Sequence, residues 1–197
     1  MAIALDSTLY DAYLGIGTFK YWRYAKLKFI SWLPFIPDDR EEGISFIKKA
    51  LEADCLSKYM AMHQLVYVLL DFDQKEAAIP YVKQIVTRYP ESQFMWWAAT
   101  KAYDDNNQFA DAIAAYNKLN YLLKEDPNPN PNHIFKCHMK LAALYQRMAD
   151  FRSCYDICNN LLTVLETSLP QDFKEKRDQV VELMELCTER LAEKNGS

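Results

Sequence analysis

The chain has 197 residues, 50% of them hydrophobic and 25% charged, and its formal net charge at pH 7 is −4. This composition is typical of a globular protein, and the length is sufficient for one domain with a continuous core. The acidic balance disfavours a dedicated nucleic-acid binder, because such domains usually carry basic surfaces. Four glycines are too few for a Gly-rich nucleotide-binding fold and also disfavour a β-sandwich.

The cysteines and the hydrophobic pattern bear on the compartment. Five cysteines cannot all pair within the chain, and their spacing fits neither a zinc module nor a small disulfide scaffold. A reducing compartment, the cytoplasm, is therefore favoured. We find no signal-peptide pattern and no stretch of about 18 apolar residues, so we expect no stable membrane insertion. If the chain is a piece of a longer exported protein, the periplasm is the alternative.

Residues 1–56 predict a degenerate helical hairpin. A first helix is expected over 8–29, and Gly15 and Gly17 lie inside it. Each glycine costs about 1 kcal/mol of helix stability relative to alanine, and the usual compensation is the close approach of a neighbouring helix backbone. After a stretch containing two prolines, a second helix is expected over 39–54.

A period of 34 residues organises the middle of the chain. When residue 59 is aligned with residue 93, the apolar positions of two helical hairpins coincide: Leu65 with Ala99, Leu69 with Tyr103, Ala78 with Ala112, Ile79 with Ile113, Val82 with Tyr116 and Ile85 with Leu119. The first hairpin predicts helices over 58–70 and 74–88. The second predicts helices over 92–104 and 109–124.

The helix expected from residue 74 has two unusual features near its start. Asp73 and Glu76 have the spacing of a capping pair, in which each carboxylate accepts a hydrogen bond from a backbone N–H at the helix N-terminus. Pro80 lies in the second turn, where proline removes a backbone hydrogen bond, so it predicts a kink or a later helix start.

The repeat resumes after a loop. Three prolines alternate with asparagines over 126–133, which predicts a non-helical spacer. A third hairpin is expected over 134–166 and a last helix over 171–194. The last helix has one apolar and one highly charged face, which suits a helix that caps the open end of a repeat array.

These residues resemble the tetratricopeptide repeat (TPR) family, with repeats over 59–92, 93–126 and 135–168. The family keeps a large residue in the first helix, here Trp96, and an aromatic residue at the turn, here Phe109 and Phe151. It also keeps a small residue early in the second helix, here Ala78 and Ala112, and a closing proline, here Pro90. The first copy departs from the pattern, with Lys75 at the aromatic position. The resemblance implies an all-α, right-handed α-α superhelix of antiparallel hairpins, forming one domain over 1–197 with three full hairpins over 57–168.

The resemblance also implies where a partner would bind. The segment 12–50 is similar to the opening of bacterial TPR proteins, many of them exported. In the TPR family the inner groove is lined mainly by residues of the first helix of each hairpin. The groove residues implied for this chain are His63, Tyr67, Trp97, Lys101, Asp104, Met139 and Arg147. Aromatic residues with a few charges suit an extended or helical peptide. They do not reproduce the Lys/Asn/Lys/Arg set with which co-chaperone repeats clamp a terminal carboxylate.

Two groups of residues could in principle carry metal chemistry. Cys154 and Cys158 lie one helical turn apart, yet they fall at core positions of the repeat, and free cysteine is among the most buried residue types. His133, Cys137 and His138 are close in sequence but lie beside a loop that is not preorganised. No nucleophile motif or phosphate-binding loop is present. We therefore predict no metal, no cofactor and no enzyme activity.

The segment 19–32 interleaves aromatic residues with Lys20, Arg23 and Lys26. It could bind a membrane surface or an acidic partner. The favoured interpretation is a packing helix with aromatic rings inside and lysine stems along its surface.

Together these patterns predict a protein–protein interaction scaffold that binds a peptide or helix of a partner in the groove. One alternative is a self-contained structural module, including a homodimer in which a second copy fills the groove. Another is a membrane-surface adaptor acting through segment 19–32.

Overall fold

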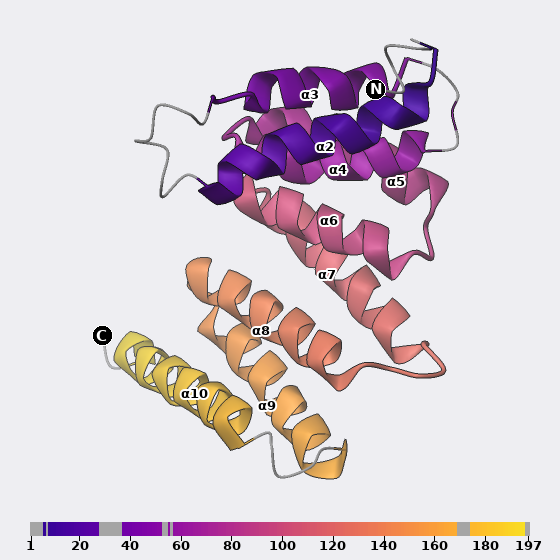
Figure 1. Cartoon of the computed structure of the whole chain (residues 1–197). Coiled ribbons are helices and arrows are strands. Elements are labelled where there is room, and N and C mark those ends of the chain that lie inside the picture. The colour runs from indigo at the N-terminus through magenta and orange to yellow at the C-terminus, as the bar shows by residue number, and fades with distance from the viewer. Residues whose placement is uncertain are drawn as a thin grey trace. The chain divides into compact units, whose positions relative to one another are not determined.

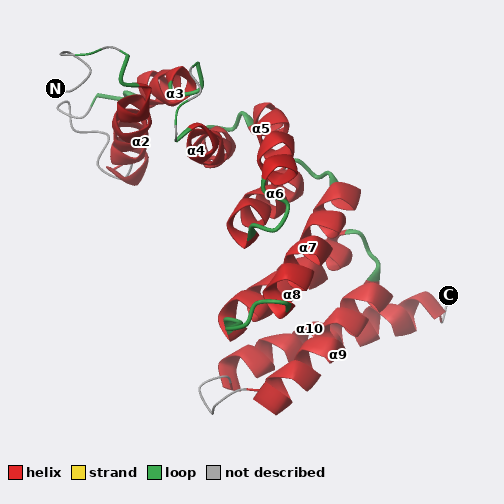
Figure 2. Cartoon of the chain, turned by 90° about the vertical axis from the view of Figure 1, so that its right-hand side faces the viewer, coloured by secondary structure: helices red, strands yellow, loops and turns green. Residues whose placement is uncertain are grey.

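The computed structural model describes residues 6, 8–27, 37–52, 55, 57–168 and 174–195. Every regular element within these ranges is an α-helix, and no strand is present among the described residues (Figures 1 and 2). The all-α class predicted from the sequence is confirmed.

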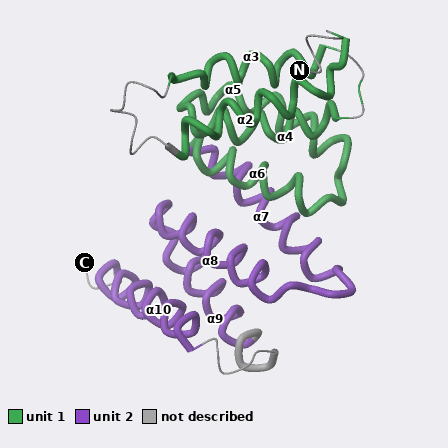
Figure 3. The backbone as a smooth tube through the Cα atoms, viewed as in Figure 1, with its two compact units in different colours: residues 1–106 green, residues 107–197 purple. Residues whose placement is uncertain are grey.

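The chain divides into two compact units, Met1–Asn106 and Asn107–Ser197 (Figure 3). The first contains α2 (Tyr10–Leu27), α3 (Arg40–Lys49), α4 (Lys58–Asp71), α5 (Lys75–Arg88) and α6 (Gln93–Asp105). The second contains α7 (Phe109–Lys124), α8 (Pro131–Arg147), α9 (Phe151–Ser168) and α10 (Lys174–Asn195). The continuous single domain expected from the repeat period stays a prediction.

In the first unit, consecutive helices pack as hairpins and each hairpin also contacts the next. α2 packs on α3 and α4 on α5, while α4 additionally contacts α2, α3 and α6. The side chains that fill these contacts are fully buried apolar residues, among them Leu65, Leu69 and Ile85. These are positions of the 34-residue repeat, so the period reflects one packing arrangement used repeatedly.

The first hairpin depends on two glycines that allow its helix backbones to touch. A Cβ atom on Gly17 would lie 2.6 Å from the carbonyl oxygen of Gly43, and one on Gly43 would lie 2.8 Å from the carbonyl oxygen of Gly17. A Cβ on Gly15 would meet nothing within 4 Å. The close approach expected of a helical glycine is therefore found at Gly17, with Gly43 as its partner, and not at Gly15.

Tyr21 joins this hairpin to α4. Its side chain is fully buried and its hydroxyl donates a hydrogen bond of 2.6 Å to Oδ2 of Asp71. Burial, and then the neighbouring Asp71 carboxylate, raises the pKa of Tyr21 well above its usual value. Tyr21 therefore stays a neutral donor.

A residue with left-handed backbone follows the first helix of three successive hairpins. These residues are Asp73, Asn107 and Ala149, with φ values of 59°, 55° and 56°. After α4 and α8 the turn is closed by backbone bonds, from Gln74 to Leu69 and from Asp150 to Tyr145, the pattern that satisfies free helix-end carbonyls. The predicted capping role of Asp73 is therefore wrong. Asp73 lies in the left-handed turn, a conformation that aspartate tolerates better than most residues. The N-cap of α5 is therefore the next residue, Gln74, which makes no side-chain cap bond.

The two proline-based predictions have different outcomes. α5 begins at Lys75 and contains Pro80, so the later helix start is wrong, whereas the kink stays a prediction. The carbonyl that Pro80 leaves without a donor belongs to Glu76, which is exposed and accessible to water. The prediction for the loop needs correction. The predicted loop 126–133 ends early, because Pro131 is the first residue of α8. Asn130 caps this helix by accepting from the backbone N–H of Asn132, and proline is well tolerated at a first helical position.

In the second unit α8 packs between α7 and α9, and α9 packs on α10. The buried centre between α8, α9 and α10 consists of small and sulfur-containing residues: Ala142, Cys154, Cys158, Leu161, Val180 and Cys187.

Replacing Gly17 with alanine should destabilise the first unit by about 1–3 kcal/mol, because the added methyl group cannot fit against the α3 backbone. Gly15→Ala should instead stabilise it by about 0.5–1 kcal/mol through helix propensity. Urea titrations followed by circular dichroism would measure both. A Gly17→Ala protein as stable as wild type would contradict the backbone contact.

Ala149→Gly should stabilise the second unit by about 0.5–1 kcal/mol, because a left-handed alanine carries a steric penalty that glycine avoids. The control is Ala114→Gly, at an exposed position inside α7, which should lower stability by about 1 kcal/mol. If both substitutions lower the urea midpoint, the left-handed turn at residue 149 is contradicted.

Candidate functional site

The first helices α4 and α6 form a common surface in the first unit, which we call the first-helix face of unit 1; it consists of Met60, His63, Tyr67, Phe94, Trp97 and Lys101. The ring of His63 stacks on that of Phe94 with a centroid separation of 3.8 Å, and the ring of Tyr67 lies 5.0 Å from His63. The stack joins the two helices directly. His63 and Tyr67, both predicted for the groove, are therefore brought together with an aromatic residue of the next repeat.

The exposed part of this surface is apolar. Phe94 is 48% exposed and Met60 is 41% exposed. On α6 the residues 94, 97, 101 and 104 recur at helical spacing and lie on one side, while Ala98, Ala99 and Ala102 are fully buried on the other. The alternation of large outward and small inward residues thus follows from the helical period.

His63 lies beneath Phe94 and is only 3% exposed. Within the described ranges, neither of its ring nitrogens has a hydrogen-bond partner. Burial lowers the pKa of His63 to about 4, and a polar contact with the backbone of Phe94, which falls short of hydrogen-bond geometry, opposes this shift only in part. His63 is therefore neutral at physiological pH and contributes a polarizable ring rather than a charge.

The two charged residues predicted for the groove on α6 lie close to its aromatic residues, and Lys101 already forms an ion pair within the helix. Nζ of Lys101 lies 2.6 Å from Oδ2 of Asp105, an i,i+4 ion pair on the same helix. Trp97 and Asp104 are half-buried on the same side of α6. Lys101 is thus less available to clamp a partner's carboxylate than its sequence position indicates.

The remaining two predicted residues, Met139 and Arg147, lie in the second unit. Arg147 donates to the side-chain oxygen of Asn107 at 2.8 Å and its guanidinium lies 5.2 Å from the ring centre of Phe109. Its main visible role is to tie the end of α8 to the start of α7. The seven predicted residues therefore fall on two separate units.

Met139 lines a groove of about 580 Å³ between α8 and α10. Ala143 and Gln146 of α8 also line it, together with residues from one side of α10: Gln179, Glu182, Leu183, Glu185, Leu186 and Glu189. Sequence reasoning missed the α10 residues because it treated this helix as a cap. Their helical spacing is the signal that could have found them.

The residues considered for metal binding are occupied by structural contacts. Cys154 and Cys158 are fully buried beside Cys187, which confirms their predicted place in the core. Burial raises the pKa of Cys137 to about 12, and its thiol donates to the carbonyl of Tyr116. His138 is buried and its Nδ1 lies 2.9 Å from the carbonyl of Ile134. Among the residues that the structure describes, no three His, Cys, Asp or Glu side chains are arranged to hold a metal ion.

In the described part of segment 19–32, two cations are paired with α3 or its cap. Lys20 contacts Glu42 at 2.7 Å, and Arg23 contacts Asp39 at 2.6 Å. Tyr21 is buried, as the packing interpretation expects, whereas Phe19 is 64% exposed. Residues 28–32 lie outside the described residues. None of the described helices is long and apolar enough to cross a membrane.

Lowering the pH from about 6.5 to about 4 should reduce the free energy of unfolding through His63. The unfolded chain binds a proton near pH 6.5, whereas the folded chain resists it until about pH 4, so unfolding is favoured as pH falls through this window. We expect a contribution of about 1–2 kcal/mol, less than the full shift implies because nearby solvent screens the charge. Urea titrations of wild type and His63→Phe at about pH 6.5 and about pH 4 should show a stability difference that shifts by this amount in favour of His63→Phe at the lower pH. An unchanged difference would contradict the neutral buried state.

Comparisons with known proteins agree with this arrangement. Residues 42–136, just under half of the chain, match the family described as bacterial transcriptional activator domain. No curated protein is significantly similar to the chain in sequence. The structure is similar to that of a candidate kinesin light chain of Podosopora anserina with nearly identical TPR-like repeats; the TM-score is 0.69 at 12% identity, over 93% of this chain and 89% of that one.

A second similar structure is MamA from Desulfovibrio magneticus RS-1, from residue 41 to its end. The TM-score is 0.55 at 20% identity, over 77% of this chain and 76% of that one. Another MamA structure gives 0.53 at 18% identity, over 81% of this chain and 96% of that one. Identities this low show the fold alone. With its helical hairpins, its left-handed turns and these structural neighbours, the chain has the fold of TPR-like α-helical repeat proteins.

Proposed function

We propose that the chain is a protein-interaction scaffold and that the first-helix face of unit 1 binds an apolar peptide or helix of a partner protein. The observation that carries the proposal is the exposed ring of Phe94, which rests on buried His63 beside exposed Met60. Large exposed aromatic and methionine side chains that are held in place from below are typical of the centres of protein interfaces.

The chemistry of this face favours apolar contact over charge recognition. His63 is neutral, and Lys101 is paired within its own helix. A partner would gain mainly by covering Phe94 and Met60, since each buried Å² of apolar surface contributes about 25 cal/mol before the costs of association. A leucine or aromatic residue on the partner would supply such contact.

The match to the bacterial transcriptional activator domain favours a second candidate. In this case the scaffold would bind a component of a transcriptional regulator, still through protein contact. A regulator protein among the partners captured in the experiment below would support it. A partner without any link to transcription would count against it.

The alternatives of a self-contained dimer and a membrane-surface adaptor remain separate proposals. A dimer would dissociate when Phe94 is removed, which sedimentation velocity can detect. For the adaptor, the pairing of Lys20 with Glu42 and of Arg23 with Asp39 leaves fewer free cations for anionic lipid. Liposome sedimentation of Lys26→Glu against wild type would test it.

Phe94→Ala should abolish capture of the partner from lysate of the source cell, because it removes the exposed ring at the centre of the proposed site. The matched control is Tyr121→Ala, since Tyr121 is 55% exposed on α7, a second helix of its hairpin. Both variants would first be compared with wild type in helicity and urea midpoint. Removal of an interface aromatic commonly costs more than about 2 kcal/mol, a loss of at least about 30-fold in affinity.

A partner retained equally by wild type, Phe94→Ala and Tyr121→Ala would place binding elsewhere and overturn the proposed face. A partner lost only from the Tyr121→Ala protein would do the same and would point to the second helices.

A further inference from the structure

Helix α10 packs against the preceding helix in the same way as the first helices of the earlier hairpins do. α9 packs on α10 as α5 packs on α6 and as α7 packs on α8. Residues of α10 also face α8 across a groove, as α6 contacts α4.

A second groove, about 600 Å³ in volume, lies between α9 and α10 and shares Glu185 and Glu189 with the α8–α10 groove. Two residues of α9, Tyr155 and Leu162, form one wall. The α10 wall is made of residues at helical spacing: Val181, Met184, Glu185, Thr188, Glu189 and Ala192. This stripe covers about 16 Å along the helix, at about 1.5 Å per residue. An open trough three turns long suits a helix better than a compact small molecule.

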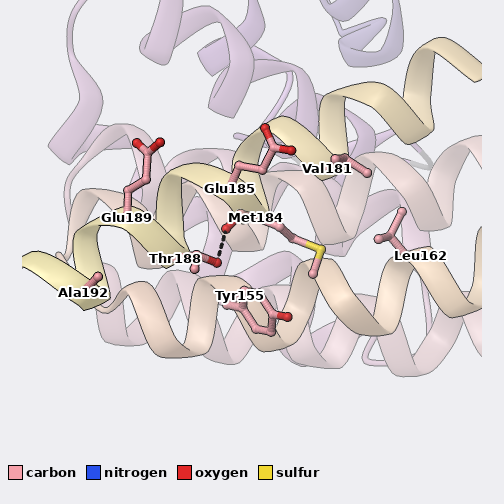
Figure 4. A pocket seen from close by; sticks show the side chains of 8 residues that line it. All are labelled: Tyr155, Leu162, Val181, Met184, Glu185, Thr188, Glu189 and Ala192. Atoms are coloured by element: carbon pink, nitrogen blue, oxygen red, sulfur yellow. Dashed lines mark hydrogen bonds between the residues drawn. The ribbon is translucent and has the colours of Figure 1, made fainter.

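The floor and the rim of this groove differ in chemistry. Figure 4 shows Met184 reaching toward Leu162, and the carboxylates of Glu185 and Glu189 projecting together from one edge of α10. The hydroxyl of Thr188 is satisfied by the carbonyl of Met184 at 2.9 Å. Neither Glu185 nor Glu189 takes part in an ion pair with any described residue. The floor therefore offers apolar contact, and the rim offers two negative charges.

We propose that the α9–α10 groove binds an amphipathic helix of a partner protein, with its apolar stripe on Met184 and Leu162 and its lysine or arginine residues against Glu185 and Glu189. The bound helix packs on α9 and α10 together, along the stripe that lines the groove. Apolar contact provides affinity, and the opposite charges fix the orientation and exclude acidic helices. This surface lies in the second unit and is independent of the first-helix face of unit 1.

The test uses two designed, fluorescently labelled 18-residue helical peptides that share one leucine stripe. One carries lysine at its flanking positions and the other carries glutamate. Fluorescence anisotropy would measure binding of each peptide to the full chain. The lysine peptide should bind, the glutamate peptide should not, and added salt should weaken the lysine complex.

Two single variants with the same change of net charge locate the site. Thr188→Arg places a long cation in the groove and should weaken the lysine peptide at least about tenfold, equivalent to about 1.4 kcal/mol. Glu182→Gln alters the neighbouring α8–α10 groove only and should leave affinity within about twofold. Equal affinity for wild type, Thr188→Arg and Glu182→Gln would overturn the proposal, as would failure of the lysine peptide to bind.

A charge-swap variant distinguishes loss of the binding site from misfolding of the protein. Glu185→Lys/Glu189→Lys should lose the lysine peptide and gain the glutamate peptide, which an unfolded protein would not do. If this double variant keeps the preference of wild type, charge complementarity at the rim is refuted.

Sedimentation velocity without peptide would show whether a second copy of the chain occupies the α9–α10 groove. A monomeric wild-type chain is expected. A dimer that Thr188→Arg converts to monomer would overturn the proposal in favour of self-association. Phe94→Ala should bind the lysine peptide as wild type does, so failure here is distinguishable from failure of the first-helix face of unit 1.

Discussion

Helix α4 has more apolar surface than α5, its hairpin partner, can cover. It also contacts α2, α3 and α6, and its buried residues extend over more than half of the helix surface. Close contact on so many sides requires small residues where backbones meet, as at Gly17 and Gly43. The repeat period, the glycines and the row of buried alanines on α6 all follow from this single packing requirement.

The same requirement explains which features of the fold were predictable from the sequence. The 34-residue period specified the helices because burial repeats with it. Exceptions arose where local backbone needs outweighed residue preference. Asp73 is predicted as a cap of α5, yet the turn that precedes this helix requires a left-handed residue at position 73. Pro80 is predicted to kink the helix or delay its start, yet α5 begins before it, and the carbonyl that it deprives of a donor belongs to Glu76, an exposed residue. In each case the deciding factor was the position relative to solvent or the turn, which the residue type alone does not reveal.

The candidate site was predictable in part for a related reason. First-helix residues could be assigned to one side of α4 and α6 from spacing, and His63, Tyr67 and Trp97 do lie there. Contacts made by charged side chains could not be assigned, because long side chains reach several neighbours. Lys101 pairs with Asp105, and Arg147 bonds to Asn107. The many charged residues of α10 also concealed the apolar residues that line the α9–α10 groove, such as Val181 and Met184. A highly charged last helix is predicted to cap a repeat array as long as its neighbours are not known.

Two surfaces with different physical character follow from this architecture. On the first-helix face of unit 1, the exposed residues are aromatic and apolar, so contact area would decide which partner the proposed site binds. In the α9–α10 groove, Glu185 and Glu189 lie beside an apolar floor, so charge would discriminate between helices of similar hydrophobicity. The two proposed sites would therefore select different partners, because a segment selected for apolar contact alone gains nothing from the acidic rim. The division into two compact units assigns one such surface to each.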